Sequence, residues 1–403
     1  MKKRTIKFVA LPLLICFIAV SAIACGSKTT PVNNSQSQPT STPSPTPGQT
    51  GNPDAGKPDN SGENVNTPFK NANQKRVKAK GLYLTATSAG SRLDHYIDLA
   101  NKTEINSYVI DYKNDYGNVC NDSKVPLAKE VGAIDKRYNA AEVTKKLHDN
   151  NIYAIARIVC FKDPILSKNK PELAIKDKDG GLYIHNKMTW VNPFNKQSWQ
   201  YSIDLAKEAL ALGFDEVQFD YIRFPDGKKS EMIFGDTGGK KYYEVINEFL
   251  AYVRQQLPDA IISGDVFAII CESPGDTEGI GQYFEYVGKD LDYLCPMAYP
   301  SHYALGQIIN KVKFPKPDLD PYGVIKNTLL KAKDRLSKVD GHKPVLRTYL
   351  QDFTATWIGK GNYQLYEDEQ VRQQIQAVYD AGYEEWILWD PMNKYREGAF
   401  KKE

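Results

Sequence analysis

Short apolar runs alternate with amphipathic helix-like segments eight times along this chain, from Lys80 to its end. The expected strands cover residues 81–86, 107–112, 152–161, 217–222, 260–267, 291–299, 344–350 and 385–390. Between them the 3.6-residue period predicts helices over residues 93–102, 140–150, 196–212, 242–257, 281–289, 322–337 and 369–381. Eight such repeats favour a (β/α)8 TIM barrel over an open sheet.

The lengths of the connecting loops support the same architecture. Turns from an expected helix to the next strand are short, whereas residues 112–139, 162–195 and 300–321 form long loops after strands. In a barrel these long loops meet at the carboxyl ends of the strands, where a substrate cleft forms. Only residues 392–403 follow the eighth strand, so closure needs that tail or a segment before the first strand.

The N-terminal residues predict export from the cytoplasm. Residues 1–25 combine a basic start, an apolar run and small residues before Cys25, as a secretory signal does. The ending Ala22-Ile23-Ala24-Cys25-Gly26 resembles a bacterial lipobox, which implies lipidation of Cys25 and attachment to the outer side of the cell membrane. Plain secretion and an uncleaved anchor are the alternatives.

Residues 26–78 are rich in Ser, Thr, Pro, Asn, Gln and Gly and contain almost no large apolar side chains. Such a segment buries too little surface to offset the entropy of ordering, so we expect a disordered tether. The domain boundaries are therefore a signal peptide at 1–25, a linker at 26–78 and a barrel at 79–403.

Charge and cysteine content exclude some classes of partner. The chain has 52 Lys and Arg against 49 Asp and Glu, but residues 1–78 hold 10 of the former and 3 of the latter, which leaves 42 against 46 in the barrel. This mildly acidic balance argues against nucleic acid. The barrel cysteines Cys120, Cys160, Cys271 and Cys295 match no zinc spacing and could be thiols or include one disulfide. We expect no metal and no cofactor.

The expected fourth strand, within Gly213–Pro225, carries Asp220 in an apolar run, where a carboxylate is costly unless it has a function. The same stretch carries Arg223, and other expected strands also end in polar residues: Asp111 and Lys113, Arg157, Asp265, Tyr299 and His302, Gln351 and Asp352, and Asp390. Carboxylates that meet at one mouth shift each other's pKa values and can act as an acid and a base or nucleophile. We expect Asp220 and Asp265 to be catalytic, with Asp111 in reserve.

Several of these residues have a structural alternative. Asp111 could pair with Lys113 or Arg157, and Arg157 and Arg223 could serve only to keep carboxylates charged.

Asp390 precedes Pro391 and could be a turn residue, Asp352 fits a helix cap or a surface position, and His302 could be an exposed loop histidine.

Aromatic side chains gather near the strand ends and suit the apolar faces of sugar rings. Trp386 is an exception, because its parity in the strand places it in the core. The residues that we expect to contact substrate are Arg157, Arg223, Trp190, Tyr299, His302, Trp389 and Asp390.

Absent motifs narrow the chemistry. The chain has no phosphate-binding or dinucleotide-binding glycine motif and no Gly-x-Ser-x-Gly, and its five histidines lack metal-ligand spacing. Paired carboxylates remain, and these are the groups that glycoside hydrolysis uses.

Several longer segments resemble a bacterial glycoside hydrolase family found in secreted lipoproteins. They are residues 190–194, 214–225, 264–267, 296–303 and 386–390, and the resemblance spans Lys80 to Lys394. It implies a barrel distantly similar to α-amylase-type hydrolases, with Asp220 as nucleophile by position. Amylase-type barrels carry arginine and a glutamate acid where this chain has Gln218 and Asp265.

We therefore expect a glycoside hydrolase that acts on a cell-wall or environmental polysaccharide. The alternative is a catalytically inactive barrel that binds carbohydrate or cell wall, which the missing glutamate favours.

Overall fold

The computed structural model describes residues 76–402, so the expected signal peptide, the lipidated Cys25 and the linker up to residue 75 lie outside the described residues. Eight strands form one closed parallel ring: β1 (Lys80–Leu84), β2 (Ser107–Lys113), β3 (Tyr153–Val159), β6 (Glu216–Asp220), β7 (Ile261–Phe267), β8 (Tyr293–Met297), β12 (Thr348–Gln351) and β13 (Trp386–Trp389). Pairing of β13 with β1 and of β7 with β8 closes it. The expected (β/α)8 barrel is confirmed.

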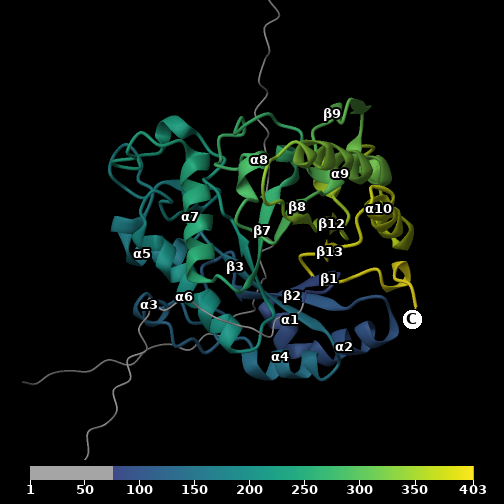
Figure 1. The fold of residues 1–403 in the computed structure, drawn as a ribbon, viewed down its shortest axis with the longest axis horizontal. Coiled ribbons are helices and arrows are strands. Elements are labelled where there is room, and N and C mark those ends of the chain that lie inside the picture. Colours follow the sequence, from purple (N-terminus) through teal and green to yellow (C-terminus); the bar gives the residue numbers. More distant parts are fainter. Residues whose placement is uncertain (1–75, 403) are drawn as a thin grey trace, which may run out of the picture. The chain divides into compact units, whose positions relative to one another are not determined.

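Helices surround this ring, as Figure 1 shows. The principal ones are α2 (Leu93–Lys102), α4 (Ala140–His148), α6 (Gln197–Ala211), α7 (Tyr242–Gln256), α9 (Pro321–Ser337) and α10 (Asp368–Asp380), each within two residues of its expected bounds. The expected helix over 281–289 is only one turn, α8 (Phe284–Val287), because Gly281 has φ of 85° and interrupts it.

Short elements lie in the connections. They are the helices α1 (Ala86–Ser91), α3 (Pro126–Glu130) and α5 (Pro164–Asn169), the hairpins β4 (Ile184–His185) with β5 (Met188–Thr189) and β9 (Gln307–Ile309) with β10 (Val312–Phe314), and strand β11 (Val345–Leu346). The two hairpins lie in the long loops after β3 and β8, as expected for elaborations of the barrel mouth.

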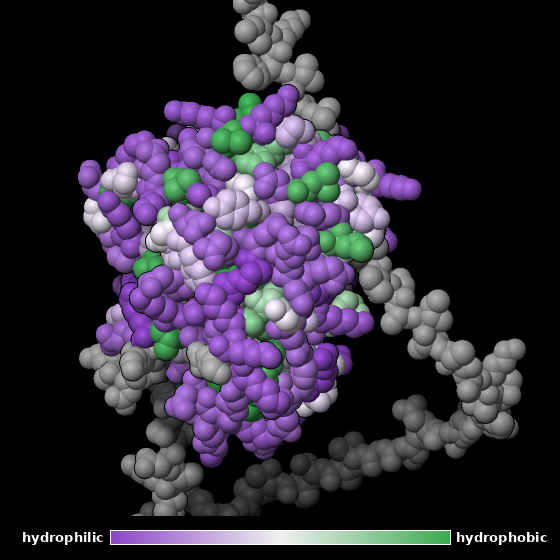
Figure 2. All heavy atoms as spheres, turned by 90° about the vertical axis from the view of Figure 1, so that its right-hand side faces the viewer, coloured by the Kyte–Doolittle hydropathy of each residue, from purple (hydrophilic) through white to green (hydrophobic). Residues whose placement is uncertain are grey.

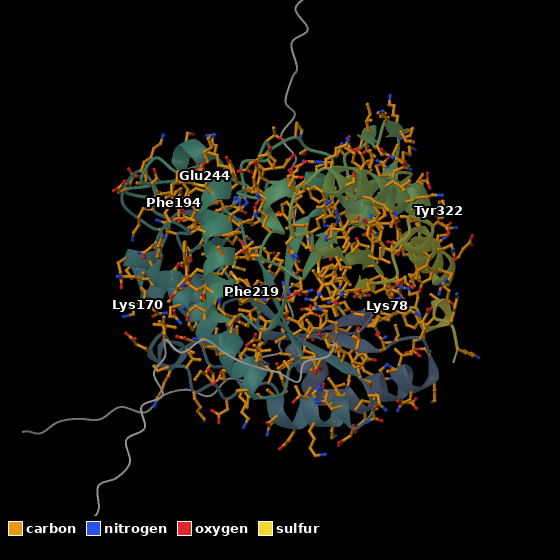
Figure 3. All side chains as sticks on the ribbon, viewed as in Figure 1. Lys78, Lys170, Phe194, Phe219, Glu244 and Tyr322 are labelled. Atoms are coloured by element: carbon orange, nitrogen blue, oxygen red, sulfur yellow. The ribbon has the colours of Figure 1, made fainter. Side chains whose placement is uncertain are left out.

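Strand β6 shows how the alternating sequence builds two layers. Phe219, which is labelled in Figure 3, belongs to this strand. Its ring points outward and meets that of Phe249 of α7, with centroids 6.1 Å apart. Glu216, Gln218 and Asp220 point inward, where they bond to side chains of other strands: Arg347, Tyr349 and Arg157, respectively. The interior of the barrel is therefore filled and partly polar, and its uppermost polar layer contains Asp220.

The C-terminal tail completes the barrel wall after β13. Phe400 stacks on the fully buried Trp386 at 6.5 Å, and the backbone N–H of Glu104 donates to the carbonyl of Lys401 at 2.9 Å. Before β1, the N–H of Trp386 donates to the carbonyl of Ala79 at 3.0 Å. The tail and the segment before β1, which the sequence suggested as the two candidates for closing the barrel, therefore both contact its wall.

The surface that carries α10 and the C-terminal tail is mostly hydrophilic, with apolar residues scattered over it (Figure 2). Among residues 76–402, no helix combines the length and apolar character that a bilayer span requires. Cys120, Cys160, Cys271 and Cys295 are all buried free thiols, so the disulfide alternative is not realised.

Candidate active site

Arg157 joins three aspartates at the carboxyl ends of neighbouring strands. From β3, its Nη1 donates to Asp111 of β2 at 2.7 Å, its Nη2 to Asp115 at 3.0 Å, and its Nε and Nη2 to Asp220 of β6 at 3.0 and 2.5 Å. Asp111 lies directly opposite Arg157 in the strand register. Arg157, Asp111 and Asp220 are all buried, so their attraction acts in a medium of low dielectric constant.

Asp111 is bonded on both carboxyl oxygens. Oδ1 accepts from Arg157, and Oδ2 accepts from the hydroxyl of Tyr83 at 2.7 Å. Burial raises the pKa of Asp111 to about 6, with a further increase from the charge of Asp115 and an opposing decrease from Arg157. Asp111 therefore changes charge close to neutral pH.

Asp115 and Lys162 belong to the same cluster, although the sequence did not single them out. Lys162 donates to Asp115 and to the hydroxyl of Tyr221, both at 3.1 Å. Burial would raise the pKa of Asp115, but the charges of Arg157 and Lys162 outweigh it and lower that pKa. The side chain of Asp115 is 31% exposed, which makes it the most accessible carboxylate around Arg157. Its place just after β2 was the available signal.

Asp220 is held by its own backbone as well as by Arg157. The N–H of Tyr221 donates to Asp220 Oδ1 at 2.6 Å. Tyr221 has φ of 51°, the left-handed region that a bulky side chain rarely adopts. Strain of this kind persists where surrounding contacts fix the backbone and is concentrated at functional sites. Three N–H bonds therefore hold the carboxyl group of Asp220 in place.

Asp265 has the opposite environment. It points into the barrel from β7, is 1% exposed, and its Oδ1 has no hydrogen-bond partner among the described residues. Burial, followed by the negative charge of Asp220, raises the pKa of Asp265 well above its usual value. Asp220 and Asp265 are thus close enough to influence each other, and burial favours the uncharged form of Asp265.

Aromatic rings occupy the strand ends on the other side of the mouth. Trp389 of β13 lies 5.6 Å from Tyr299, 5.4 Å from Phe353 and 6.3 Å from Tyr83. His302 is half-buried beside Tyr299 at 5.2 Å.

Residues 81–395 match the sequence family described as "Putative glycosyl hydrolase domain". The chain belongs to this family. A search of curated proteins finds no match.

Several solved structures are similar to this glycosyl hydrolase family member. A hypothetical protein from Ruminiclostridium thermocellum is 55% identical in sequence, with a TM-score of 0.44. The match spans 46% of this chain and 97% of that protein's chain. The PgaB (BpsB) glycoside hydrolase domain from Bordetella bronchiseptica is 12% identical, with a TM-score of 0.55, and the match spans 78% of this chain and 94% of that chain. An inactive mutant of a GH20 exo-β-N-acetylglucosaminidase from Vibrio harveyi is 14% identical, with a TM-score of 0.52, and the match spans 81% of this chain and 55% of that chain. The last two show that the barrel fold is shared.

Arg223 and Trp190 lie together on this family member, and both contact the ring of Tyr221, at 5.0 and 5.7 Å. Arg223 donates to Asp226 at 3.3 Å, and its guanidinium lies 5.1 Å from the Trp190 ring and 4.3 Å from that of Phe267. Trp190 is 2% exposed, so little of its ring is available to a sugar.

Asp390 occupies a turn after β13. Its carboxylate accepts from the N–H of Met392 at 2.6 Å and lies 3.8 Å from Arg396. These are the contacts of a turn residue, the alternative that the sequence offered for Asp390. Asp352 is fully buried rather than at a cap or surface, and burial raises its pKa to about 7. The sequence could not show this, because the tail residue Arg396 that covers Asp352 is distant in the chain.

Lys113 does not pair with Asp111. Its Nζ lies 2.8 Å from Asp163 and donates to the carbonyl of Val159 at 2.6 Å, with both charged side chains almost fully buried. Asp111 instead pairs with Arg157, one of the two partners that the sequence offered.

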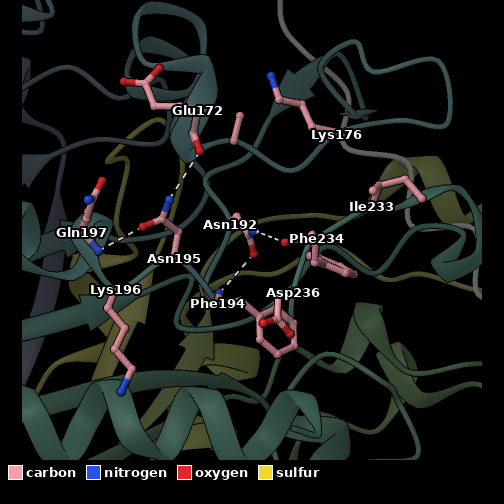
Figure 4. Close-up of a pocket in the computed structure, with 12 residues that line it drawn as sticks. Glu172, Lys176, Asn192, Phe194, Asn195, Lys196, Gln197, Ile233, Phe234 and Asp236 are labelled. Atoms are coloured by element: carbon pink, nitrogen blue, oxygen red, sulfur yellow. Dashed lines mark hydrogen bonds between the residues drawn. The ribbon is translucent and has the colours of Figure 1, made fainter. Parts of the chain in front are cut away.

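A surface hollow of about 550 Å3 lies between the loops after β3 and β6, and none of the expected catalytic residues lines it. In Figure 4, Asn192 donates to the carbonyl of Phe234 and accepts from the N–H of Phe194. Its amide therefore joins the two loops. Among residues 76–402, no group of three or more His, Cys, Asp or Glu side chains has the arrangement of a metal site.

Proposed function

We propose that this glycosyl hydrolase family member cleaves glycosidic bonds of a cell-wall or environmental polysaccharide, with Asp220 as nucleophile or base and Asp265 as acid. The observation that carries the proposal is the contrast between the two carboxyl groups. Asp220 accepts N–H bonds from Arg157 and Tyr221, whereas Asp265 is buried without a partner for Oδ1, with a raised pKa. Glycoside hydrolysis needs one carboxylate and one carboxylic acid.

In this mechanism Asp265 gives its proton to the glycosidic oxygen as the bond to the anomeric carbon breaks. The carboxylate of Asp220 either attacks the anomeric carbon or takes a proton from the attacking water. Arg157 positions Asp220 and offsets its charge while the sugar becomes positively charged.

The pH dependence separates Asp265 from Asp111 as the acid. An acid must be protonated, so activity falls as the pH rises through its pKa. If Asp111 were the acid, kcat/KM would decline from about pH 6, the pKa that burial gives it. With Asp265 as the acid, the decline begins at higher pH and Asp111→Asn retains most of the activity.

The direct test measures reducing ends released from a panel of polysaccharides and cell-wall preparations. We expect the exported chain to cleave at least one, and Asp220→Asn to reduce the rate by more than about 100-fold. Asp204→Asn is the matched control, because Asp204 lies on the outer helix α6 and accepts from Gln200 at 2.7 Å. Full activity of a correctly folded Asp220→Asn protein would refute the assignment.

The second candidate is a binding protein without catalysis. It is favoured by the same Arg157, which bonds to Asp111, Asp115 and Asp220 and so restrains all three carboxylates. Retention of a polysaccharide by the protein, with no release of reducing ends over the whole pH range, would support this function instead.

We also propose that Cys25 carries a lipid that holds the barrel on the outer side of the cell membrane. The support is the basic and apolar signal pattern before Cys25 and the linker composition of residues 26–78. Cells supplied with a radiolabelled fatty acid should label the wild-type protein but not Cys25→Ser. Equal labelling of both proteins would contradict lipidation at this cysteine.

A further inference from the structure

The mouth of the barrel has two unlike halves. Strands β2, β3 and β6 are neighbours and carry the Arg157 cluster, whereas β8, β12, β13 and β1 follow one another on the opposite side. We use "aromatic half" for the six ring-bearing residues at or after the ends of these last four strands: Tyr83, Tyr299, His302, Phe353, Trp357 and Trp389.

The rings of the aromatic half form a continuous path to the carboxylates. Trp357 stacks on Phe353 at 5.7 Å with an angle of 16°, and Phe353 lies 5.4 Å from Trp389. Trp389 lies 6.3 Å from Tyr83, whose hydroxyl donates to Asp111. Along this path Phe353, Trp389 and Tyr83 thus lie between Trp357 and Asp111.

Exposure increases toward the outer end of this path. Tyr83 and Phe353 are 6% and 7% exposed, whereas Trp357 is 44% exposed. Phe353 supports the Trp357 ring from behind, and the indole therefore keeps a large open surface in a fixed orientation. A flat, partly apolar surface that is already ordered costs little entropy when a ligand binds to it.

The aromatic half carries no net charge near neutral pH. Burial lowers the pKa of His302 to about 4, so its imidazole is uncharged there. The nearby carboxylates of Asp352 and Asp390 both face Arg396, at 3.6 and 3.8 Å. None of the six side chains that make up the aromatic half is a cation that could compensate an ionised sugar.

We propose that Trp357 is an outer platform for a polymeric glycan without ionised groups, which lies across the aromatic half as it enters the site. The proposal rests on the proposed function, because Arg157 joins Asp111, at the inner end of the path, to the proposed catalytic Asp220. It specifies a neutral polymer as the substrate class. The substrate is a polymer because a single sugar at the carboxylates would not reach Trp357, and it is neutral because the aromatic half supplies no cation.

Native affinity electrophoresis tests the platform without requiring cleavage. The exported chain carrying Asp220→Asn is run through gels that contain a β-glucan, a galactomannan, a dextran or the anionic polygalacturonate. We expect at least one neutral polysaccharide to retard it and Trp357→Ala in the same background to weaken that binding by about 5- to 10-fold. Leu365→Ala is the matched control, because Leu365 is an apolar residue of the same β12–α10 connection and is 63% exposed.

Unchanged binding of Trp357→Ala would overturn the platform, as would equal weakening by Leu365→Ala, retardation by polygalacturonate alone, or no retardation by any polymer. The hydrolysis assay is read separately. Cleavage that survives Asp220→Asn refutes the catalytic assignment but leaves the platform standing, whereas normal binding by Trp357→Ala together with loss of cleavage in Asp220→Asn refutes only the platform.

Discussion

Replacing Arg157 by Met should destabilise the protein in a pH-dependent way. The substitution keeps an unbranched side chain but removes the charge that bonds to Asp111, Asp115 and Asp220. Breaking a buried ion pair by removing one partner costs about 3–5 kcal/mol. For a domain of this size, such a loss lowers Tm by about 5–10 °C.

The sign of the pH effect follows from the carboxyl pKa values. A carboxyl whose pKa is raised in the folded state binds its proton there more readily than in the unfolded chain, so the protein loses stability as pH rises between the two values. For Asp111 this window runs from about 4, its usual pKa, to about 6 in the folded protein. Without Arg157 the pKa of Asp111 rises further and one of the two charges that lower the pKa of Asp115 is lost, so the window extends upward.

Thermal unfolding followed by circular dichroism at about pH 5 and about pH 7.5 measures this effect. We expect Arg157→Met to lose more stability at the higher pH, where unpaired carboxylates must stay charged. Arg223→Met is the control: burial would raise the pKa of its partner Asp226, but His185 and Arg223 lower it. A lowered pKa contributes stability above about pH 4, so this control should lose equally at both pH values. Equal losses for Arg157→Met would refute our reasoning.

Three further substitutions test other parts of the structure. Asp265→Asn should change Tm little, because burial favours the uncharged form of Asp265, which Asn resembles, while hydrolysis falls by more than about 100-fold; a large fall in Tm would show that its charge is needed for folding. Asp115→Asn should lower the pKa of Asp111, since a neighbouring negative charge is removed, and carboxyl 13C NMR titration would show no shift if the two do not interact. Phe400→Ala should cost about 3 kcal/mol through lost packing on Trp386, and an unchanged urea midpoint would show that the tail does not support the barrel.

The sequence by itself determined the barrel. The parity of β6 placed Phe219 outward and Asp220 inward, and the short turns before strands and long loops after them identified the mouth. These features are local, because strand alternation and helix periodicity are set by neighbouring residues. The short helix expected near residues 281–289 is present as α8 but covers only one turn, and the left-handed backbone of Gly281 before it depends on tertiary contacts.

Only the tertiary structure decided which charges meet. From the sequence, either Lys113 or Arg157 could be the partner of Asp111. Arg157 is the partner because the parallel register of β2 and β3 places it directly opposite Asp111. Asp115 and Lys162 joined the cluster through the conformations of separate loops, which no local pattern encodes. Protonation follows from the same packing, because burial and neighbouring charge set a pKa and both arise from residues distant in the chain.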